Sequence, residues 1–226
     1  MPLFLFDVFG NASIGIYSLV NDKIAILPPQ VPESKRNKVG NWLKVKVIPT
    51  TIGKSVIIGV LASSNSNGIV LPAFTEEEEI EAIKSSSDLN IAVMNTKKTA
   101  YGNMVLANDK GAIVGPGLEK EDTNKIKDTL GVEVISTKIA GLPYVGSLAT
   151  ATNKGVLAHP MLKDEEREVM EDIFKVPVDV GTVNCGIPYV ATGLVANSNG
   201  AVVGLLTTGP EMFIIGHALD VVRENE

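Results

Sequence analysis

The sequence has little of the chemistry on which catalytic and metal sites are usually built. It contains one cysteine, two histidines and one tryptophan among 226 residues. A single cysteine excludes an intramolecular disulfide framework, and with two histidines it leaves too few ligands for a zinc cluster, which needs about four. We therefore expect no metal, no cofactor and a reducing, cytoplasmic compartment.

Long apolar runs and an excess of basic residues are also missing. No segment approaches the ~20 consecutive apolar residues that span a bilayer, and the apolar N-terminus MPLFLFDVFG lacks the basic flank of a signal peptide. The net charge of -6 argues against wrapping nucleic acid, because phosphate binding depends on clustered lysines and arginines. We expect a monomer with no membrane stage, whose partner is a protein with at most a small RNA contact beside it.

What the sequence does contain is an internal repeat of about 44 residues. The tetrapeptide NSNG ends at Gly68 and again at Gly200, and turn-like segments fill the intervals between and before these copies. The five turn anchors are Ile24, Gly68, Gly111, Gly155 and Gly200. Nine residues before each anchor stands a small residue, in order Gly15, Gly59, Gly102, Gly146 and Ala191.

Each repeat predicts the same succession of elements. The small residue precedes a β-rich run, a turn of Asn, Asp, Lys or Gly, and a second β-rich run, which is typical of a β-hairpin. A helical segment follows, as in FTEEEEIEAIKSS, where we expect Thr75 to cap the helix and Glu78 to complete a capping box. A further strand is expected over 43–49, 90–95, 132–137 and 176–181. The unit is therefore ββαβ.

Only the fifth unit is incomplete, because a strand and a helix over 211–222 leave little chain for its last strand. We expect LFLFDVF, residues 3–9, to supply that strand beside the C-terminal segment. Closure of this kind removes exposed sheet edges. The sequence predicts an α/β (α+β) fold in which residues 1–226 form a single domain, a closed ring of five pseudo-symmetric ββαβ units whose neighbours share a core.

Five such units resemble the pentein fold, whose members are guanidine-modifying enzymes and a non-catalytic ribosome factor. The segments SNSNG, TAYGN, TNKGVLAHP, GTVNCG and TTGPE resemble those of the translation initiation factor six family, in its archaeal form. This resemblance covers essentially the whole chain. It implies a ribosome anti-association factor rather than an enzyme.

The resemblance implies a partner and a mode of action. Members bind the intersubunit face of the large ribosomal subunit, mostly on a ribosomal protein beside the sarcin-ricin loop, and block joining of the small subunit by occupancy. A role in large-subunit maturation is implied too. Release involves an elongation-factor-like GTPase and the Shwachman-Bodian-Diamond protein, so no nucleotide site is expected in this chain.

Candidate ribosome-binding residues also come from the resemblance. Asn103 follows Gly102 and matches the family, whereas Val60 and Val93 stand where some relatives carry basic residues. Tyr101 belongs either to the same surface or to the interior of its own sheet. Lys54 is either a solvated loop residue or a contact to an rRNA phosphate.

Other positions extend or weaken this assignment. Leu206 departs from relatives, which often have Asp before the Thr pair. By symmetry the residues after the other three small residues, Ile16, Ser147 and Thr192, are expected on the same side of the ring. We favour units two and three as the contact.

Two alternative functions remain open from the sequence. Cys185 keeps a guanidine-modifying enzyme under consideration, since such enzymes use a cysteine nucleophile with His and acidic partners, although we interpret His159 and His217 as structural. A five-unit scaffold for other proteins is the second alternative. A phosphate-binding P-loop ending at Ser55 is excluded, because Ile48 stands where the motif requires its first glycine.

Overall fold

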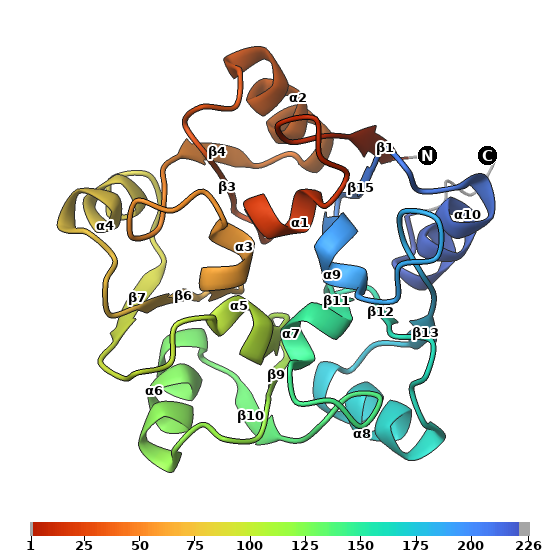
Figure 1. Ribbon diagram of the computed structural model, residues 1–226. Helices are drawn as coiled ribbons and strands as arrows, with labels where there is room; N and C mark the ends of the chain where they lie inside the picture. The colour runs from red at the N-terminus through yellow and green to blue at the C-terminus, as the bar shows by residue number, and fades with distance from the viewer. Residues whose placement is uncertain (1, 222–226) are drawn as a thin grey trace.

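The chain folds into five similar units that follow one another around an axis (Figure 1). The computed structural model describes residues 2–221. Each unit has a three-stranded sheet. The first two strands form an antiparallel hairpin. In units one to four the third strand pairs parallel to the second after a crossover through the longer helix, and in unit five the N-terminal strand takes this place. The predicted ββαβ unit is therefore present, with a one-turn helix added in front of it.

The elements recur in the same order in units one to four, and unit five differs only in taking its third strand from the N-terminus. The one-turn helices are α1 (Ile14–Tyr17), α3 (Ile58–Leu61), α5 (Tyr101–Met104), α7 (Val145–Leu148) and α9 (Val190–Gly193). The hairpins are β2 (Leu19–Val20) with β3 (Ile24–Leu27), β5 (Ser63–Ser64) with β6 (Gly68–Pro72), β8 (Val105–Ala107) with β9 (Gly111–Val114), β11 (Ala149–Ala151) with β12 (Val156–Ala158), and β14 (Leu194–Asn197) with β15 (Gly200–Gly204). The longer helices are α2 (Glu33–Leu43), α4 (Glu77–Lys84), α6 (Lys120–Leu130), α8 (Asp164–Phe174) and α10 (Gly209–Ala218). The third strands are β4 (Lys46–Pro49), β7 (Asn90–Met94), β10 (Glu133–Ser136), β13 (Val178–Val180) and, for unit five, β1 (Leu3–Phe6).

The hairpin turns form where the repeated tetrapeptide predicts them. In unit two, the side-chain oxygen of Asn65 accepts hydrogen bonds from the backbone N–H groups of Asn67 at 2.9 Å and Gly68 at 3.1 Å. This is an Asx turn, in which a side chain takes the place of a backbone acceptor. Asn197 makes the same two bonds in unit five. Both copies of NSNG are thus structural turns.

The run after each small residue is not the long strand that the sequence predicts. In unit one it begins as helix α1, and only the two residues of β2 are extended. The reason is a close approach of neighbouring units. A Cβ added to Gly59 would lie 1.9 Å from the carbonyl oxygen of Gly15, so the helices meet backbone to backbone.

The N-terminal cap of α4 also differs from the prediction. Glu76, not Thr75, is the N-cap, and the box is completed by Glu79 rather than Glu78. Thr75 is buried and donates its hydroxyl to the carbonyl oxygen of Pro72 at 2.8 Å. The helix therefore begins one residue later than the Thr suggested, and Glu79 points inward.

Neighbouring units share their hydrophobic cores, as the size of one unit predicts. One cluster combines Leu106 and Ile113 of unit three with Met170 and Phe174 of unit four. Another combines Val70 of unit two with residues of unit three. Each of the clusters formed by residues 2–221 draws on two neighbouring units, so the units depend on one another for stability.

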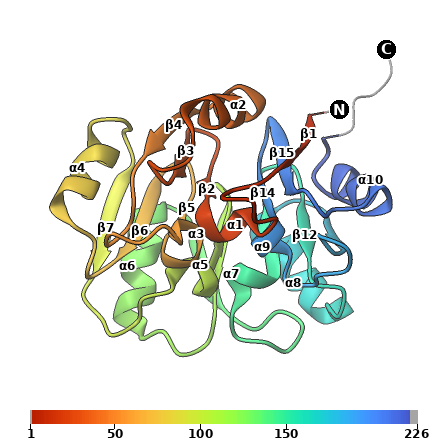
Figure 2. The same ribbon diagram turned by 45° about the horizontal axis from the view of Figure 1, so that its top comes forward.

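The fifth unit meets the first. Strand β1 pairs parallel to β15, with Leu3 opposite Ala201, which is the strand that the sequence assigns to residues 3–9. Helix α9 contacts α1, and β14 contacts β2. Figure 2 shows the N-terminal strand beside β15, next to α10. Helix α10 ends at Ala218, and the end of the predicted 211–222 helix lies outside the described residues.

Candidate binding face

The one-turn helices surround the axis on one side of the molecule, which we call the axial face (Figure 1). The residue after each small residue lines a single shallow depression of about 30 Å³ at its centre. These residues are Ile16, Val60, Asn103, Ser147 and Thr192. The structure thus brings Val60 and Asn103 together, with the three residues that symmetry places beside them.

Backbone packing beneath the depression fixes these side chains. A Cβ at Gly102 would lie 1.9 Å from the Gly59 carbonyl oxygen, and a Cβ at Gly146 would lie 2.0 Å from that of Gly102. No real side chain tolerates such distances without a shift of the backbone. The small residues are therefore structural, and the variable residue that follows each of them carries the surface chemistry.

Asn103 differs from the other polar residues of the depression. The hydroxyl of Ser147 donates to the carbonyl oxygen of Tyr144 at 2.8 Å, and that of Thr192 donates to Tyr189 at 2.7 Å. Within residues 2–221, the side-chain amide of Asn103 makes no hydrogen bond to another protein group; its backbone N–H bonds to Ala100. Its amide has both donors and an acceptor available to a partner.

Tyr101 does not belong to the surface, which corrects its assignment as a contact residue. Its side chain has no exposed area, and its hydroxyl pairs with that of Thr96 at 2.8 Å. Burial raises the pKa of this hydroxyl above its usual value. Tyr101 anchors α5 from below, and so supports the position of Asn103.

Val93 and Lys54 lie apart from the central depression. Val93 is half-buried on β7 and packs against the core of unit two, with its carbonyl oxygen bonded to Lys125 Nζ at 2.7 Å. Lys54 is exposed in the loop before α3, where its Nζ lies 3.1 Å from a Glu76 carboxylate oxygen. The structure therefore groups only Val60 and Asn103 of the predicted residues.

A repeated carboxylate braces the loops that border the axial face. Glu79 accepts hydrogen bonds from the backbone N–H groups of Gly53 and Lys54. Glu166 accepts from Ala140 and Gly141. Each of these glutamates also bonds the N-cap of its own helix. This second role was not predicted from the sequence. The only signal for it is the glutamate at the third position of α4 and of α8, which is the spacing of a capping box.

Glu211 holds the equivalent loop in unit five. It accepts from the N–H groups of Cys185 and Gly186, at 3.1 and 2.8 Å, and from the Thr182 hydroxyl at 2.7 Å. Burial works to raise the pKa of Glu211, but its hydrogen bonds, the largest from the Thr208 backbone N–H, outweigh burial and lower the pKa to about 2. A carboxylate that is ionised and bonded in this way fixes the loop that precedes α9.

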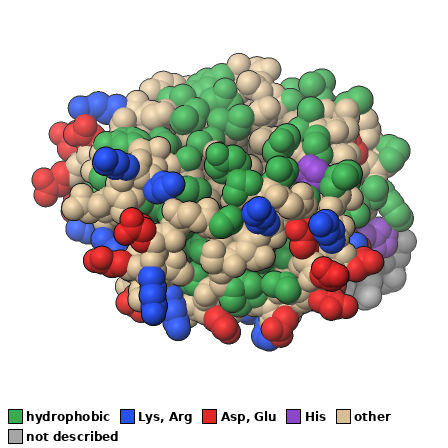
Figure 3. Space-filling model, turned by 60° about the horizontal axis from the view of Figure 1, so that its bottom comes forward, with side chains coloured by type: hydrophobic (Ala, Val, Ile, Leu, Met, Phe, Trp, Pro, Cys, Tyr) green, Lys and Arg blue, Asp and Glu red, His purple; other side chains and the backbone are tan. Residues whose placement is uncertain are grey.

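The axial face carries exposed apolar side chains on several of these loops. Tyr144 is 59% exposed, Tyr189 45% and Phe9 51%, and Leu142 and Ile187 lie on the same loops as the two tyrosines. In Figure 3 hydrophobic and uncharged side chains cover much of the upper part of the view, basic side chains are scattered at its upper left and across its middle, and carboxylates lie mainly toward the left edge, the lower edge and the lower right. Such a surface suits a protein partner better than a nucleic acid backbone.

Among residues 2–221, no hydrogen bond joins the Cys185 thiol to His159 or His217. Cys185 is exposed in a turn, with its backbone held by Glu211. His159 is buried; its Nδ1 accepts from the Met161 N–H at 3.1 Å and burial lowers its pKa. His217 stacks edge-on against Phe213 on α10.

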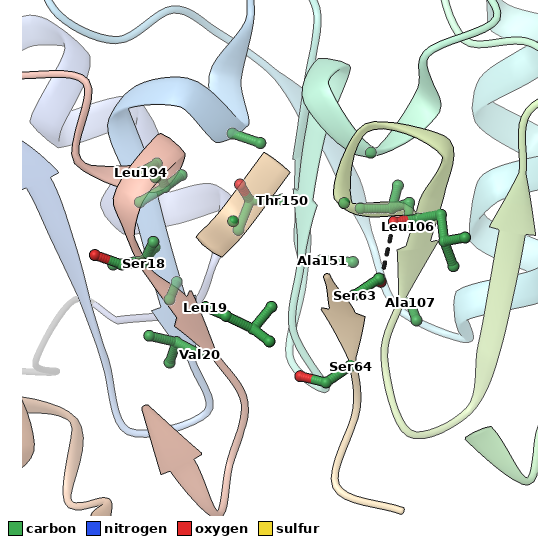
Figure 4. A pocket seen from close by; sticks show the side chains of 18 of the residues that line it. Ser18, Leu19, Val20, Ser63, Ser64, Leu106, Ala107, Thr150, Ala151 and Leu194 are labelled. Carbon is green, nitrogen blue, oxygen red and sulfur yellow. Dashed lines mark hydrogen bonds between the residues drawn. The ribbon is translucent and has the colours of Figure 1, made fainter. Parts of the chain in front are cut away.

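Residues 2–221 contain neither a metal-binding cluster nor a membrane-spanning helix. No group of three or more His, Cys, Asp or Glu side chains is placed to hold a metal, and no helix in that range is long and apolar enough to cross a membrane. The cavity along the axis, shown in Figure 4, holds about 110 Å³, below the ~300 Å³ at which ligand pockets begin.

Five three-stranded units that share their hydrophobic cores, with the one-turn helices gathered on one face, define the class of fold. Comparison with known proteins gives the family. The eIF-6 family model matches residues 4–218, and the chain belongs to that family.

The relatives carry one name. Proteins named Translation initiation factor 6 are 45% identical in Pyrococcus abyssi, over 96% of this chain and 97% of theirs, and 40% identical in Staphylothermus marinus, over 97% and 98%. The Methanocaldococcus jannaschii protein is 42% identical over 94% and 96%. A solved structure of DDAH from Pseudomonas aeruginosa, in complex with citrulline, is distantly similar, with a TM-score of 0.45 and 13% identity over 74% of this chain and 68% of that one.

Proposed function

We propose that this chain binds the intersubunit face of the large ribosomal subunit through its axial face and sterically prevents association with the small subunit. Membership of the eIF-6 family supports a role in translation. We choose the axial face because of one observation. The side-chain amide of Asn103, which bonds no other group of residues 2–221, lies in a depression that exposed apolar side chains surround.

The chemistry of the surface favours a protein that blocks the subunit face by being bound there, rather than one that catalyses a reaction. The described residues show no pairing of Cys185 with a histidine, and the axial cavity is small. A standard interface needs about 800 Å² from each partner, and the accessible surface of 10063 Å² lets one face supply it. The chain therefore acts as a blocker, not as an enzyme with Cys185 as its nucleophile.

The partner that we propose is a ribosomal protein beside the sarcin-ricin loop. The net charge of -6 and the apolar axial face suit a protein contact, and Lys54 offers at most a minor contact to rRNA. An elongation-factor-like GTPase and the Shwachman-Bodian-Diamond protein would then remove the factor. Its place of action is the cytoplasm, during subunit maturation and before subunits join.

Sedimentation tests this proposal directly. Purified protein is mixed with salt-washed archaeal large subunits, and the pellet is compared with that from small subunits alone. We expect the protein to sediment with large subunits only, and to lower the yield of 70S particles when it is added before small subunits. No cosedimentation, or unchanged 70S formation at saturating protein, would refute the proposal.

A further inference from the structure

Four of the five junctions between neighbouring units carry the same hydrogen bond next to the axis. A side-chain amide donates to the backbone carbonyl oxygen of the residue that holds the same place in the next unit. The bonds run from Asn21 to Asn65 (2.8 Å), Asn65 to Asn108 (3.1 Å), Asn108 to Thr152 (3.0 Å) and Asn197 to Asn21 (3.2 Å). At the junction of units four and five the residue is Thr152, whose hydroxyl donates within its own turn, to Gly155.

The same junction lacks the glycine contact of the one-turn helices. A Cβ at Gly15 would lie 1.8 Å from the carbonyl oxygen of Ala191, and the three junctions from unit one to unit four show the same close approach. In α9 the equivalent residue is Ala191, which has a Cβ. Helix α9 therefore cannot approach α7 as closely as the other helices approach their neighbours.

A buried hydroxyl at this junction is left without a partner. Ser63, four residues after Gly59, donates its hydroxyl across the junction of units two and three to the carbonyl oxygen of Val105 at 3.1 Å. Thr150 stands four residues after Gly146, and its Oγ1 is buried without a hydrogen bond to any group of residues 2–221. Figure 4 labels both side chains in the axial cavity, with the Ser63 bond dashed. The bond made at one junction is thus missing at the other.

Unit four contributes little to the buried apolar cluster at this junction. In the cluster that joins these two units, unit four contributes Leu157 alone among the residues described, and the remaining members belong to unit five. The cluster between units one and two contains Ile24, Ile26 and Ile48 of unit one. A junction with fewer polar bonds and less shared apolar surface opens at a lower free energy.

We propose that the junction between α7 and α9 is the opening joint of the ring, at which units four and five separate locally while the other junctions stay closed. Ser147 on α7 and Thr192 on α9 border the axial depression from either side of this joint. Opening therefore reshapes the axial face. That consequence for docking rests on the proposed function, whereas the joint itself does not.

Hydrogen exchange of the free, full-length chain tests the joint. Amides of α9 and β14 are compared with those of α3 and β5 and of α5 and β8 by mass spectrometry under native conditions. We expect α9 and β14 to exchange about fivefold faster or more, as the loss of one junction bond would produce. Equal or slower exchange overturns the proposal.

Two variants with opposite expected effects test the joint further. Thr152→Asn with Ala191→Gly restores the missing amide and the missing close approach, and should slow exchange of α9 and β14 by about fivefold. Asn65→Thr removes both bonds that this amide donates to unit three, to the carbonyl oxygens of Asn108 and Leu130. Its turn should survive, because the Thr152 hydroxyl accepts from the N–H groups of Lys154 and Gly155 in the equivalent turn.

The outcomes are distinct. Asn65→Thr should speed exchange of α5 and β8 by about fivefold. If the restored variant folds with unchanged exchange of α9 and β14, or if Asn65→Thr leaves α5 and β8 unaffected, these bonds do not set the opening and the proposal is wrong. Ribosomes are absent from the experiment, so its result is independent of the proposed function.

Discussion

The side-chain amide of Asn197 donates a 3.2 Å hydrogen bond to the backbone carbonyl oxygen of Asn21, which lies 176 residues earlier in the chain. A second bond from the same amide, of 2.9 Å, reaches the carbonyl oxygen of Leu43 at the end of α2. Both acceptors belong to unit one and the donor to unit five. One buried side chain thus forms its own hairpin turn and joins the two ends of the repeat array.

Replacing Asn197 with Ala should destabilise the protein strongly. The change removes two bonds between units and the side-chain oxygen that accepts from the N–H groups of Asn199 and Gly200, so these groups and the Asn21 carbonyl oxygen lose their Asn197 partner. We expect a loss of about 2–4 kcal/mol in the free energy of unfolding, measured by urea denaturation. Asn199→Ala, which removes one bond to Leu43, is the control and should cost about 1 kcal/mol. Equal losses would contradict a junction role for Asn197.

The repeats could be predicted from the sequence because their signals are local. Asn, Gly and β-branched residues specify each hairpin within a few positions, and the turns fall at the predicted anchors. The one-turn helices could not be predicted in this way. The sequence after Gly15 predicts a strand. The helix found there packs against the backbone carbonyl group of Ala191, which is distant in the sequence, so no local pattern indicates it.

Adding a methyl group to Gly59 tests whether this close approach is required. Gly59→Ala places a Cβ where the Gly15 carbonyl oxygen lies 1.9 Å away, so α1 and α3 must separate. Overpacking of this kind costs about 1–3 kcal/mol, and we expect a matching fall in the urea midpoint. Gly209→Ala is the control, since no atom lies within 4 Å of the added Cβ. An unchanged midpoint for Gly59→Ala would mean that the junction adapts freely.

Acid should destabilise the protein through Glu211. Its pKa is about 2 in the folded chain, against 4.5 for the unperturbed group. Because the folded pKa is lower, the stabilisation is full above pH 4.5 and is lost as the pH falls from 4.5 towards 2. The difference corresponds to about 3 kcal/mol at most. The pKa of Glu79 is also lowered, against the effect of burial, by the Thr51 hydroxyl and backbone N–H groups, so it acts in the same direction.

Urea titrations at several pH values isolate the contribution of Glu211. Glu211→Gln should reduce stability at pH 7 and flatten the fall of stability between about pH 4.5 and 2, because the titrating group is gone. Glu77→Gln, an exposed residue in the first turn of α4, is the control and should keep the acid dependence of the natural chain. An equally steep fall in Glu211→Gln would assign the acid sensitivity to other groups.

The candidate site was only partly accessible to sequence reasoning. Asn103 and Val60 both follow from the family resemblance, and symmetry adds Ile16, Ser147 and Thr192 beside them. Burial of Tyr101 depends on how α5 lies over the sheet, which no local pattern in TAYGN reports. The bracing role of Glu211 depends on a loop about 25 residues earlier, so its capping-box spacing alone does not reveal the second set of bonds.

A charged side chain at Asn103 should weaken binding to large subunits and leave the fold intact. Asn103→Arg removes the unpaired amide and places a bulky cation in the axial depression, which a protein partner must then desolvate. We expect at least a tenfold loss of affinity in sedimentation titrations, about 1.4 kcal/mol. The melting temperature should barely move, since surface changes usually stay within about 0.5 kcal/mol of folding free energy.

The matched control places the same change on the side of the ring that carries the hairpin turns, away from the axial face. Asn90 is exposed at the start of β7, opposite Gly68 and its hairpin turn, away from the one-turn helices. Asn90→Arg alters the net charge identically, so it separates a local effect at the axial face from a general electrostatic effect on RNA. Binding should be retained, or slightly raised, in Asn90→Arg. If the two variants have the same affinity for large subunits, or if Asn90→Arg alone loses affinity, the ribosome contacts a different face of the ring. Asn103 is then not part of the contact.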